Sequence, residues 1–170
     1  LLVPSDATST RWATEYAAKT WGPCYLRLSR DVYPDLYAPD YKFECGKGAI
    51  VRDGSDVTVI ACGLLVHKAI EAANELEKKG VSVRVVDMYS VKPIDRELIL
   101  KCAEETGAIV TAEEHNIYGG LGSAVSEVLA WAGAGVPTEF VGIRDTFTES
   151  APYAQLLAKY GVDANGVAAG

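Results

Sequence analysis

The hydrophobic residues of this chain follow two different periods. From residue 48 onward, short continuous apolar runs alternate with longer segments in which apolar residues recur at helical spacing. This pattern predicts two strands on either side of Asp53-Gly54, and further strands and helices along the rest of the chain. We expect the later strands at 81–87, 107–112 and 138–143, and helices at 64–79, 95–105, 123–132 and 152–160.

The order of these segments predicts the fold class. Strands that alternate with helices of about ten to sixteen residues are typical of a parallel sheet covered by helices on both faces. The sequence Asp53-Gly54 between two apolar runs is a hairpin signal, so one strand is expected to be antiparallel and to lie at an edge. We therefore predict an α/β fold: a three-layer αβα, doubly wound, mostly parallel sheet with one antiparallel edge strand.

The first thirty residues form a separate strand–helix–strand pattern. "LLVP" predicts a buried strand, Asp6 is a candidate N-cap for a helix over 7–21, and "CYLRLS" predicts a second strand. The chain opens inside an apolar run with no methionine before it, so we expect a fragment that begins within another α/β domain. We predict that 1–30 is the end of that domain, that 31–47 is an aromatic linker lying against a surface, and that 48–170 is the second domain.

One strand of the first segment carries an unusual charge. In "YLRLSRDVYP", alternation places Leu26, Leu28 and Arg30 on one face and Arg27 and Ser29 on the other. We expect Leu26 and Leu28 to lie in a core, and Arg30 to be the point where this face meets a crevice. For Arg27 we favour a structural ion pair.

Composition and charge narrow the classes of partner. The 170 residues carry a net charge of −7, which disfavours nucleic acid and anionic membrane surfaces as partners. The longest apolar run, 57–66, is too short to span a bilayer. Four widely spaced cysteines and two histidines lack metal-ligand spacing, so we expect no metal, buried free thiols and a cytoplasmic location. The cysteines are Cys24, Cys45, Cys62 and Cys102.

The loop "EEHNIYGGLGSAV" at 113–125 is the most conspicuous candidate site. Its glycines precede a helix whose N-terminus could hold an anion, as in a dinucleotide fingerprint. Val125 replaces the third glycine, however, and the unit is not the first of its domain, so we favour a tight turn with close helix packing. His115 follows Glu113 and Glu114 at a strand end and could act as an acid or a cation, or could be a contact residue.

Several stretches together resemble the C-terminal domain of thiamine-diphosphate enzymes of the transketolase group. They are "GKGAIVRDGSDVTVIACG", "KAIEAANELEKKGVSVRVVDMYSVKPID", "TAEEHNIYGGLGSAVSEVLA" and "FTESAPYAQLLAKYGV". Within the group, "YLRLSRD" is similar to the transketolase strand ending in Leu-Ser-Arg, and the last stretch is similar to the ending of split transketolase subunits. In that ending, Thr148 and Ala151 replace glycines.

The resemblance implies a function for the complete enzyme. Transketolases transfer a two-carbon ketol unit between sugar phosphates, in the pentose phosphate pathway, using thiamine diphosphate and Mg²⁺ or Ca²⁺. The family binds these cofactors in regions that this chain does not match, so we expect no catalytic, cofactor or metal residue here and no activity of the fragment alone. The implied partners are an N-terminal transketolase section or subunit, a second copy of the C-terminal domain, and sugar phosphates.

The resemblance also implies a role for one residue. The family's Ser-Arg arginine binds the substrate phosphate and matches Arg30, with Ser29 and His115 as weaker candidates for the same site. Three alternatives stay open. Two are relatives with the same domain, 1-deoxyxylulose 5-phosphate synthase and the beta subunit of 2-oxoacid dehydrogenases. The third is a non-catalytic dimerisation or docking domain.

Overall fold

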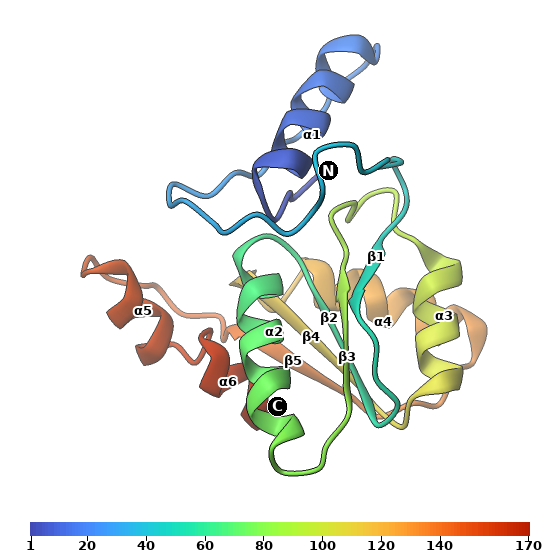
Figure 1. Ribbon diagram of the computed structural model, residues 1–170, viewed down its shortest axis with the longest axis vertical. Coiled ribbons are helices and arrows are strands. Elements are labelled where there is room, and N and C mark those ends of the chain that lie inside the picture. Colours follow the sequence, from blue (N-terminus) through green and yellow to red (C-terminus); the bar gives the residue numbers. More distant parts are fainter.

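The computed structural model describes residues 1–170 and contains one five-stranded sheet with helices on both faces (Figure 1). The strand order is β1-β3-β2-β4-β5, and every pair is parallel except β1 with β3. This confirms the predicted fold class, including the antiparallel strand at an edge. The elements are α1 (Ala7–Lys19), β1 (Ala49–Arg52), β2 (Val57–Ala61), α2 (Leu64–Glu77), β3 (Val83–Asp87), α3 (Arg96–Glu105), β4 (Ile109–Asn116), α4 (Leu121–Ala132), β5 (Thr138–Ile143), α5 (Tyr153–Lys159) and α6 (Ala164–Ala169).

Alternation along the central strands divides the core into two layers. Val59 and Ala61 of β2 face the layer under α2, α5 and α6, whereas Ile60 of the same strand faces the layer under α3 and α4. Because successive side chains of a strand point to opposite faces, a strand covered on both sides is apolar throughout, and this explains the continuous apolar runs of the sequence. The helices that cover the two layers lie on either side of the sheet in Figure 1.

The hairpin predicted around Asp53-Gly54 is wrong. β1 pairs antiparallel with β3, while β2 lies on the other side of β3 and pairs with β3 and β4. The loop between β1 and β2 therefore passes the start of β3, where a Cβ on Gly54 would lie 2.3 Å from the carbonyl carbon of Val83. The glycine is needed for this close approach rather than for a two-residue turn.

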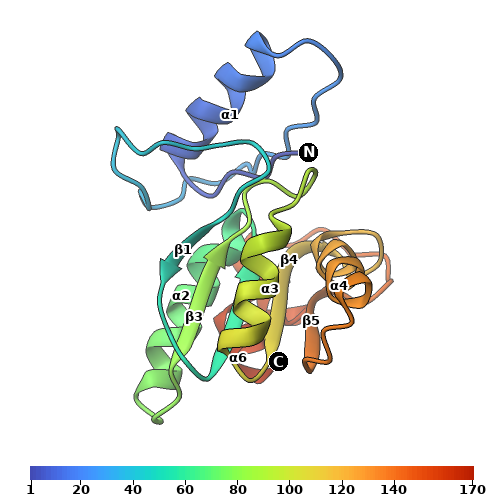
Figure 2. The same cartoon turned by 90° about the vertical axis from the view of Figure 1, so that its right-hand side faces the viewer.

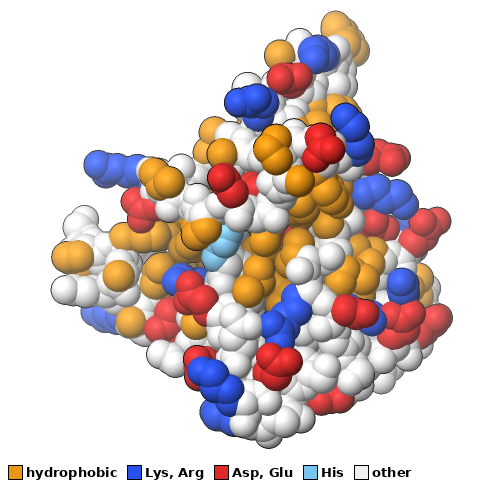
Figure 3. All heavy atoms as spheres, in the orientation of Figure 1, with side chains coloured by type: hydrophobic (Ala, Val, Ile, Leu, Met, Phe, Trp, Pro, Cys, Tyr) orange, Lys and Arg blue, Asp and Glu red, His pale blue; other side chains and the backbone are white.

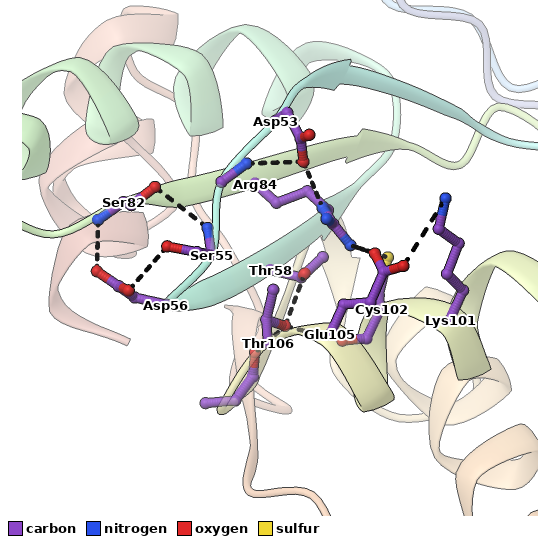
Figure 4. Close-up of polar contacts among 12 residues, drawn as sticks. Asp53, Ser55, Asp56, Thr58, Ser82, Arg84, Lys101, Cys102, Glu105 and Thr106 are labelled. Carbon is purple, nitrogen blue, oxygen red and sulfur yellow. Dashed lines mark hydrogen bonds and ion pairs between the residues drawn. The ribbon is translucent and has the colours of Figure 1, made fainter.

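Several groups of polar contacts lie at the amino ends of the central strands (Figure 4). The guanidinium of Arg84, whose side chain is 8% exposed, donates to Asp53 at 2.9 Å and to Glu105 at 2.6 Å. Beside it, the hydroxyls of Thr58 and Thr106 are 2.9 Å apart. The buried cation is thus paired with carboxylates from the β1–β2 loop and from the end of α3.

The N-terminal segment and the linker lie over the opposite end of the sheet (Figure 2). Helix α1 begins with a capping box in which Asp6 accepts from the Ser9 amide at 2.7 Å, which confirms the predicted N-cap. The linker packs through an aromatic cluster, as predicted for 31–47. Its members are Trp12, Tyr37, Tyr41, Phe43 and Tyr89, with ring centroids 4.5–5.5 Å apart.

Several local predictions for the chain ends need correction. The two N-terminal strands reduce to isolated bridges of Leu2, a parallel one to Leu26 and an antiparallel one to Ser90. Pairing therefore stops early, and Leu28 is 53% exposed instead of lying in a core. Helix α6 was not predicted, because Asn and Gly within it have low helix propensity. Cys24 is exposed and Cys45 half-buried, so only Cys62 and Cys102 are buried thiols.

One buried carboxyl group joins the N-terminal segment, the linker and the sheet. Asp87, at the end of β3, is fully buried, and its Oδ2 accepts hydrogen bonds from the hydroxyls of Ser5 at 2.5 Å and Tyr37 at 2.8 Å. Burial raises the pKa of Asp87 to about 7, with a smaller contribution in the same direction from Asp6. Ser5 and Tyr37 act in the opposite direction, because their hydrogen bonds stabilise the charged form.

We expect this carboxyl group to make stability depend on pH. Its pKa in the folded chain lies above the ordinary value of 3.8, so the folded state holds the proton more tightly and stability falls as pH rises from about 4 to about 7. Asp87→Asn keeps an oxygen acceptor but cannot ionise. Over that interval, the wild-type free energy of unfolding should fall by about 1.4 kcal/mol per pH unit relative to Asp87→Asn, measured by urea denaturation. If the free energy of unfolding had the same pH dependence in both proteins, the raised pKa of Asp87 would be contradicted.

Candidate functional site

A cavity of about 490 Å³ lies between the N-terminal segment, helix α2, strand β4 and helix α5. It opens at the carboxyl ends of the parallel strands, where open α/β sheets bind their ligands. In the orientation of Figure 1, hydrophobic side chains gather where the N-terminal segment and linker meet the helices of the sheet (Figure 3). The residues that line the cavity are Val3, Pro4, Arg27, Leu28, Ser29, Arg30, Asp31, Tyr33, Gly63, Leu64, Glu114, Ala151, Tyr153 and Leu156.

Arg30 and Ser29 both line this cavity, as expected for a residue pair at the edge of a crevice. Arg30 is exposed and makes no hydrogen bond or ion pair within the chain. The Ser29 hydroxyl accepts from the Asp31 amide at 3.3 Å, which fixes the turn that follows. The guanidinium of Arg30 is therefore free to bind an anion.

Arg27 lines the same cavity, and the ion pair favoured for it is wrong. Its guanidinium donates to the backbone carbonyl of Glu114 and makes no ion pair with a carboxylate. The alternation that separated Arg27 from Arg30 does not apply, because strand pairing ends at Arg27, whose amide donates to the Leu2 carbonyl at 3.0 Å. No local pattern indicated that the two arginines converge.

The cavity also meets the start of helix α2. Gly63 is the N-cap, with φ of 57°, and no side chain caps the helix. The unpaired amides and the helix dipole of a fourteen-residue helix favour negative charge at this end. Asp31 and Glu114 contribute carboxylates to the lining, so the cavity has separate cationic and anionic groups.

His115 lies outside this cavity. It is on β4, its side chain is 47% exposed, and its Nδ1 lies 2.8 Å from the Asn116 carbonyl and 3.8 Å from Oε2 of Glu113. The structure therefore brings Arg30 and Ser29 together but does not bring His115 to them. His67, the other histidine, packs against Tyr33 and lies 2.7 Å from the Ser5 carbonyl.

The glycine-rich loop has a structural role. The buried carboxylate of Glu113 accepts from the amides of Leu121 at 2.8 Å and Gly122 at 2.9 Å, so it occupies the N-terminus of α4. A Cβ on Gly120 would lie 2.0 Å from this carboxylate, and a Cβ on Gly122 would lie 2.4 Å from the Phe140 ring. An internal anion fills the position that a dinucleotide phosphate would need, which supports the tight turn and close packing that we favoured.

A mostly parallel αβα sheet and a cavity whose two arginines have no carboxylate partner define an α/β domain with a candidate anion-binding cavity. Residues 46–167 match the family described as "Transketolase, C-terminal domain", and the chain belongs to this family. It is 40% identical over 168 residues to a subunit of apulose-4-phosphate transketolase from Phocaeicola vulgatus, covering 98% of this chain and 53% of that protein. It is 42% identical over 172 residues to 1-deoxy-D-xylulose-5-phosphate synthase 1 of Geobacter sulfurreducens, covering 99% and 27%.

A solved structure agrees with the fold. The protein described as "Split gene transketolase, inactive beta4 tetramer" superposes with a TM-score of 0.93 at 50% identity, covering 99% of this chain and 55% of that one. The chain thus spans about half the length of the Phocaeicola relative and of this neighbour. The predicted resemblance to the transketolase C-terminal region is confirmed.

We expect Glu113 to stabilise the domain rather than to bind a ligand. Glu113→Ala would leave two buried amides without an acceptor, so the free energy of unfolding in urea should fall by about 2–4 kcal/mol. Glu113→Gln keeps one side-chain oxygen and should lose about half as much. If neither change lowered the free energy of unfolding, the amides of Leu121 and Gly122 would have other acceptors.

Proposed function

We propose that this chain is the C-terminal part of a thiamine-diphosphate-dependent transketolase that transfers a two-carbon ketol unit between sugar phosphates of the pentose phosphate pathway. The observation that carries the proposal is Arg30: it occupies the family's Ser-Arg position and lies, without a partner in the chain, in the cavity at the carboxyl ends of the strands. In this proposal, Arg30 binds the substrate phosphate and Ser29 assists.

The chemistry of the cavity supports an anionic substrate. A guanidinium pairs with a phosphate through two parallel hydrogen bonds, which are about twice as strong as those between neutral groups. The uncapped start of α2 adds backbone donors near the same cavity. The names of both relatives above include a sugar phosphate, apulose 4-phosphate in one and 1-deoxy-D-xylulose 5-phosphate in the other. His115 has no place in this cavity, and its substrate role stays a prediction.

Other parts of the protein would supply the cofactor. No group of three or more His, Cys, Asp or Glu side chains in the chain is arranged to hold a metal ion. We propose that an N-terminal section or subunit binds both thiamine diphosphate and Mg²⁺ or Ca²⁺, that the chain alone is inactive, and that the C-terminal domain forms a homodimer. No helix of the structure has the length and hydrophobicity to cross a bilayer. The domain limits at 30 and 47 and the cytoplasmic location stay predictions.

A second candidate function is that of a 1-deoxyxylulose 5-phosphate synthase, since a synthase of this name is 42% identical over almost the whole chain. Turnover by the complete enzyme distinguishes the two. A transketolase should transfer a ketol unit to D-ribose 5-phosphate and should not consume pyruvate. Pyruvate consumption would instead support the synthase, and no turnover of either substrate would favour a docking domain.

Arg30→Ala in the complete enzyme tests the phosphate role. Losing the charged hydrogen-bond donor should cost about 1.5–3 kcal/mol of binding to phosphorylated acceptors, which is roughly a tenfold to hundredfold rise in KM. Steady-state kinetics with an unphosphorylated acceptor provide the control, because that KM should not change. Equal losses with both acceptors would show that Arg30 has a structural role.

A further inference from the structure

The carboxyl end of strand β4 extends beyond its neighbour β2. The last pairing of the two strands joins Ala61 to Ala112, and the amide of Cys62 donates to the Ala112 carbonyl at 3.4 Å. β4 continues to Asn116, whereas β2 has ended and the chain turns into α2. The last residues of β4 therefore have no strand on the β2 side, and their backbone groups on that side need partners from elsewhere.

The carbonyl of Glu114 points to this open side. The carbonyls before and after it, at Glu113 and His115, face β5, where a Cβ on Gly142 would lie 3.4 Å and 2.9 Å from their oxygens. Backbone groups alternate in direction along a strand, so the Glu114 carbonyl faces away from β5. The guanidinium of Arg27 donates to this carbonyl and takes the place that the amide of a neighbouring strand would occupy.

Arg27 is also the last residue of the N-terminal segment that is held before the chain passes the cavity. Its amide donates to the Leu2 carbonyl at 3.0 Å. From residue 28 to residue 35, no backbone group makes a hydrogen bond to another segment, and the chain is next held by Asp6, which binds two amides of the linker. Arg30 lies in this unsupported stretch, so its position depends on where Arg27 is fixed.

The two arginines of the cavity differ in what their guanidiniums are bound to. Arg27 is half-buried and bound to a carbonyl of the chain, whereas Arg30 is exposed and has no partner in the chain. Arg30 is the group that is free to bind an anion. A guanidinium is planar and rigid, so the bond of Arg27 to β4 fixes the direction of its segment as well as its distance from the sheet.

We infer that Arg27 is a positioning residue, which holds Arg30 at the cavity by tying the end of its segment to the Glu114 carbonyl. This inference rests on the proposed function, because it takes Arg30 as the ligand of the substrate phosphate. Arg27 raises the affinity for phosphate through Arg30 and not by contact with the ligand. Its effect should therefore disappear when Arg30 is removed.

A double-mutant cycle on the complete enzyme tests this, with binding of D-ribose 5-phosphate measured by calorimetry. Arg27→Met removes the donors and keeps most of the alkyl stem. Alone, it should weaken binding about threefold to tenfold, the range for one lost hydrogen bond. In an Arg30→Ala background, the same change should weaken binding less than about twofold, because no guanidinium is left to position.

Two further variants separate the bond to β4 from general loosening of the segment. Arg27→Lys keeps a charged donor for the same carbonyl, and its binding should stay within about threefold of the wild type. Tyr25→Ala is the matched control on the same stretch of chain. The Tyr25 side chain is 64% exposed and its backbone bond to Leu2 is unaffected, so this variant should bind like the wild type.

The outcomes distinguish the inference from the proposed function. If Arg30→Ala weakens binding but Arg27→Met does not, or if Arg27→Met has the same effect with and without Arg30, the positioning role is wrong and the phosphate site stands. Binding by Arg27→Lys or Tyr25→Ala that is as weak as that of Arg27→Met would also contradict the positioning role. If the wild type does not bind the ester, or if Arg30→Ala has no effect, the phosphate site and the inference both fail.

Discussion

The arrangement of this protein depends on the buried carboxyl group of Asp87. It stands at the end of a central strand and accepts hydrogen bonds from Ser5 in the N-terminal segment and Tyr37 in the linker. Asp6, next to Ser5, accepts the amides of Leu36 and Tyr37 and so fixes the linker a second time. The N-terminal segment and the linker are thereby held over the carboxyl ends of the strands, where the cavity forms.

The two ends of the sheet differ in whether their arginine side chains are paired with carboxylates. At the amino ends, Arg84 is enclosed and paired with Asp53 and Glu105. At the carboxyl ends, Arg27 and Arg30 line a cavity and have no carboxylate partner. A paired buried cation stabilises a packed structure, whereas an unpaired cation at a cavity can bind an anion. The contrast favours the carboxyl ends of the strands as the place for an anionic ligand, in agreement with the proposed function.

The glycine-rich loop shows why a motif needs its structural context. Gly120 and Gly122 have the spacing of a phosphate-binding turn, but the carboxylate of Glu113 already accepts the amides at the start of α4. A helix N-terminus attracts negative charge from any source, including a side chain of the same domain. The same physical preference therefore produces an internal cap here, and the helix that begins at the cavity is α2, which no side chain caps.

The sequence by itself determined the fold class, the Asp6 cap and the candidate Arg30, whereas the antiparallel edge strand was expected from a hairpin that does not form. These depend on local periodicity, on capping chemistry or on a family motif, all of which lie within short stretches of chain. Only the tertiary structure decided which strand β1 pairs with, that Arg27 joins Arg30, and that Tyr33 and Tyr153 meet beside Glu114. Such contacts join segments far apart in sequence, so they depend on packing and long-range hydrogen bonds that no local pattern records.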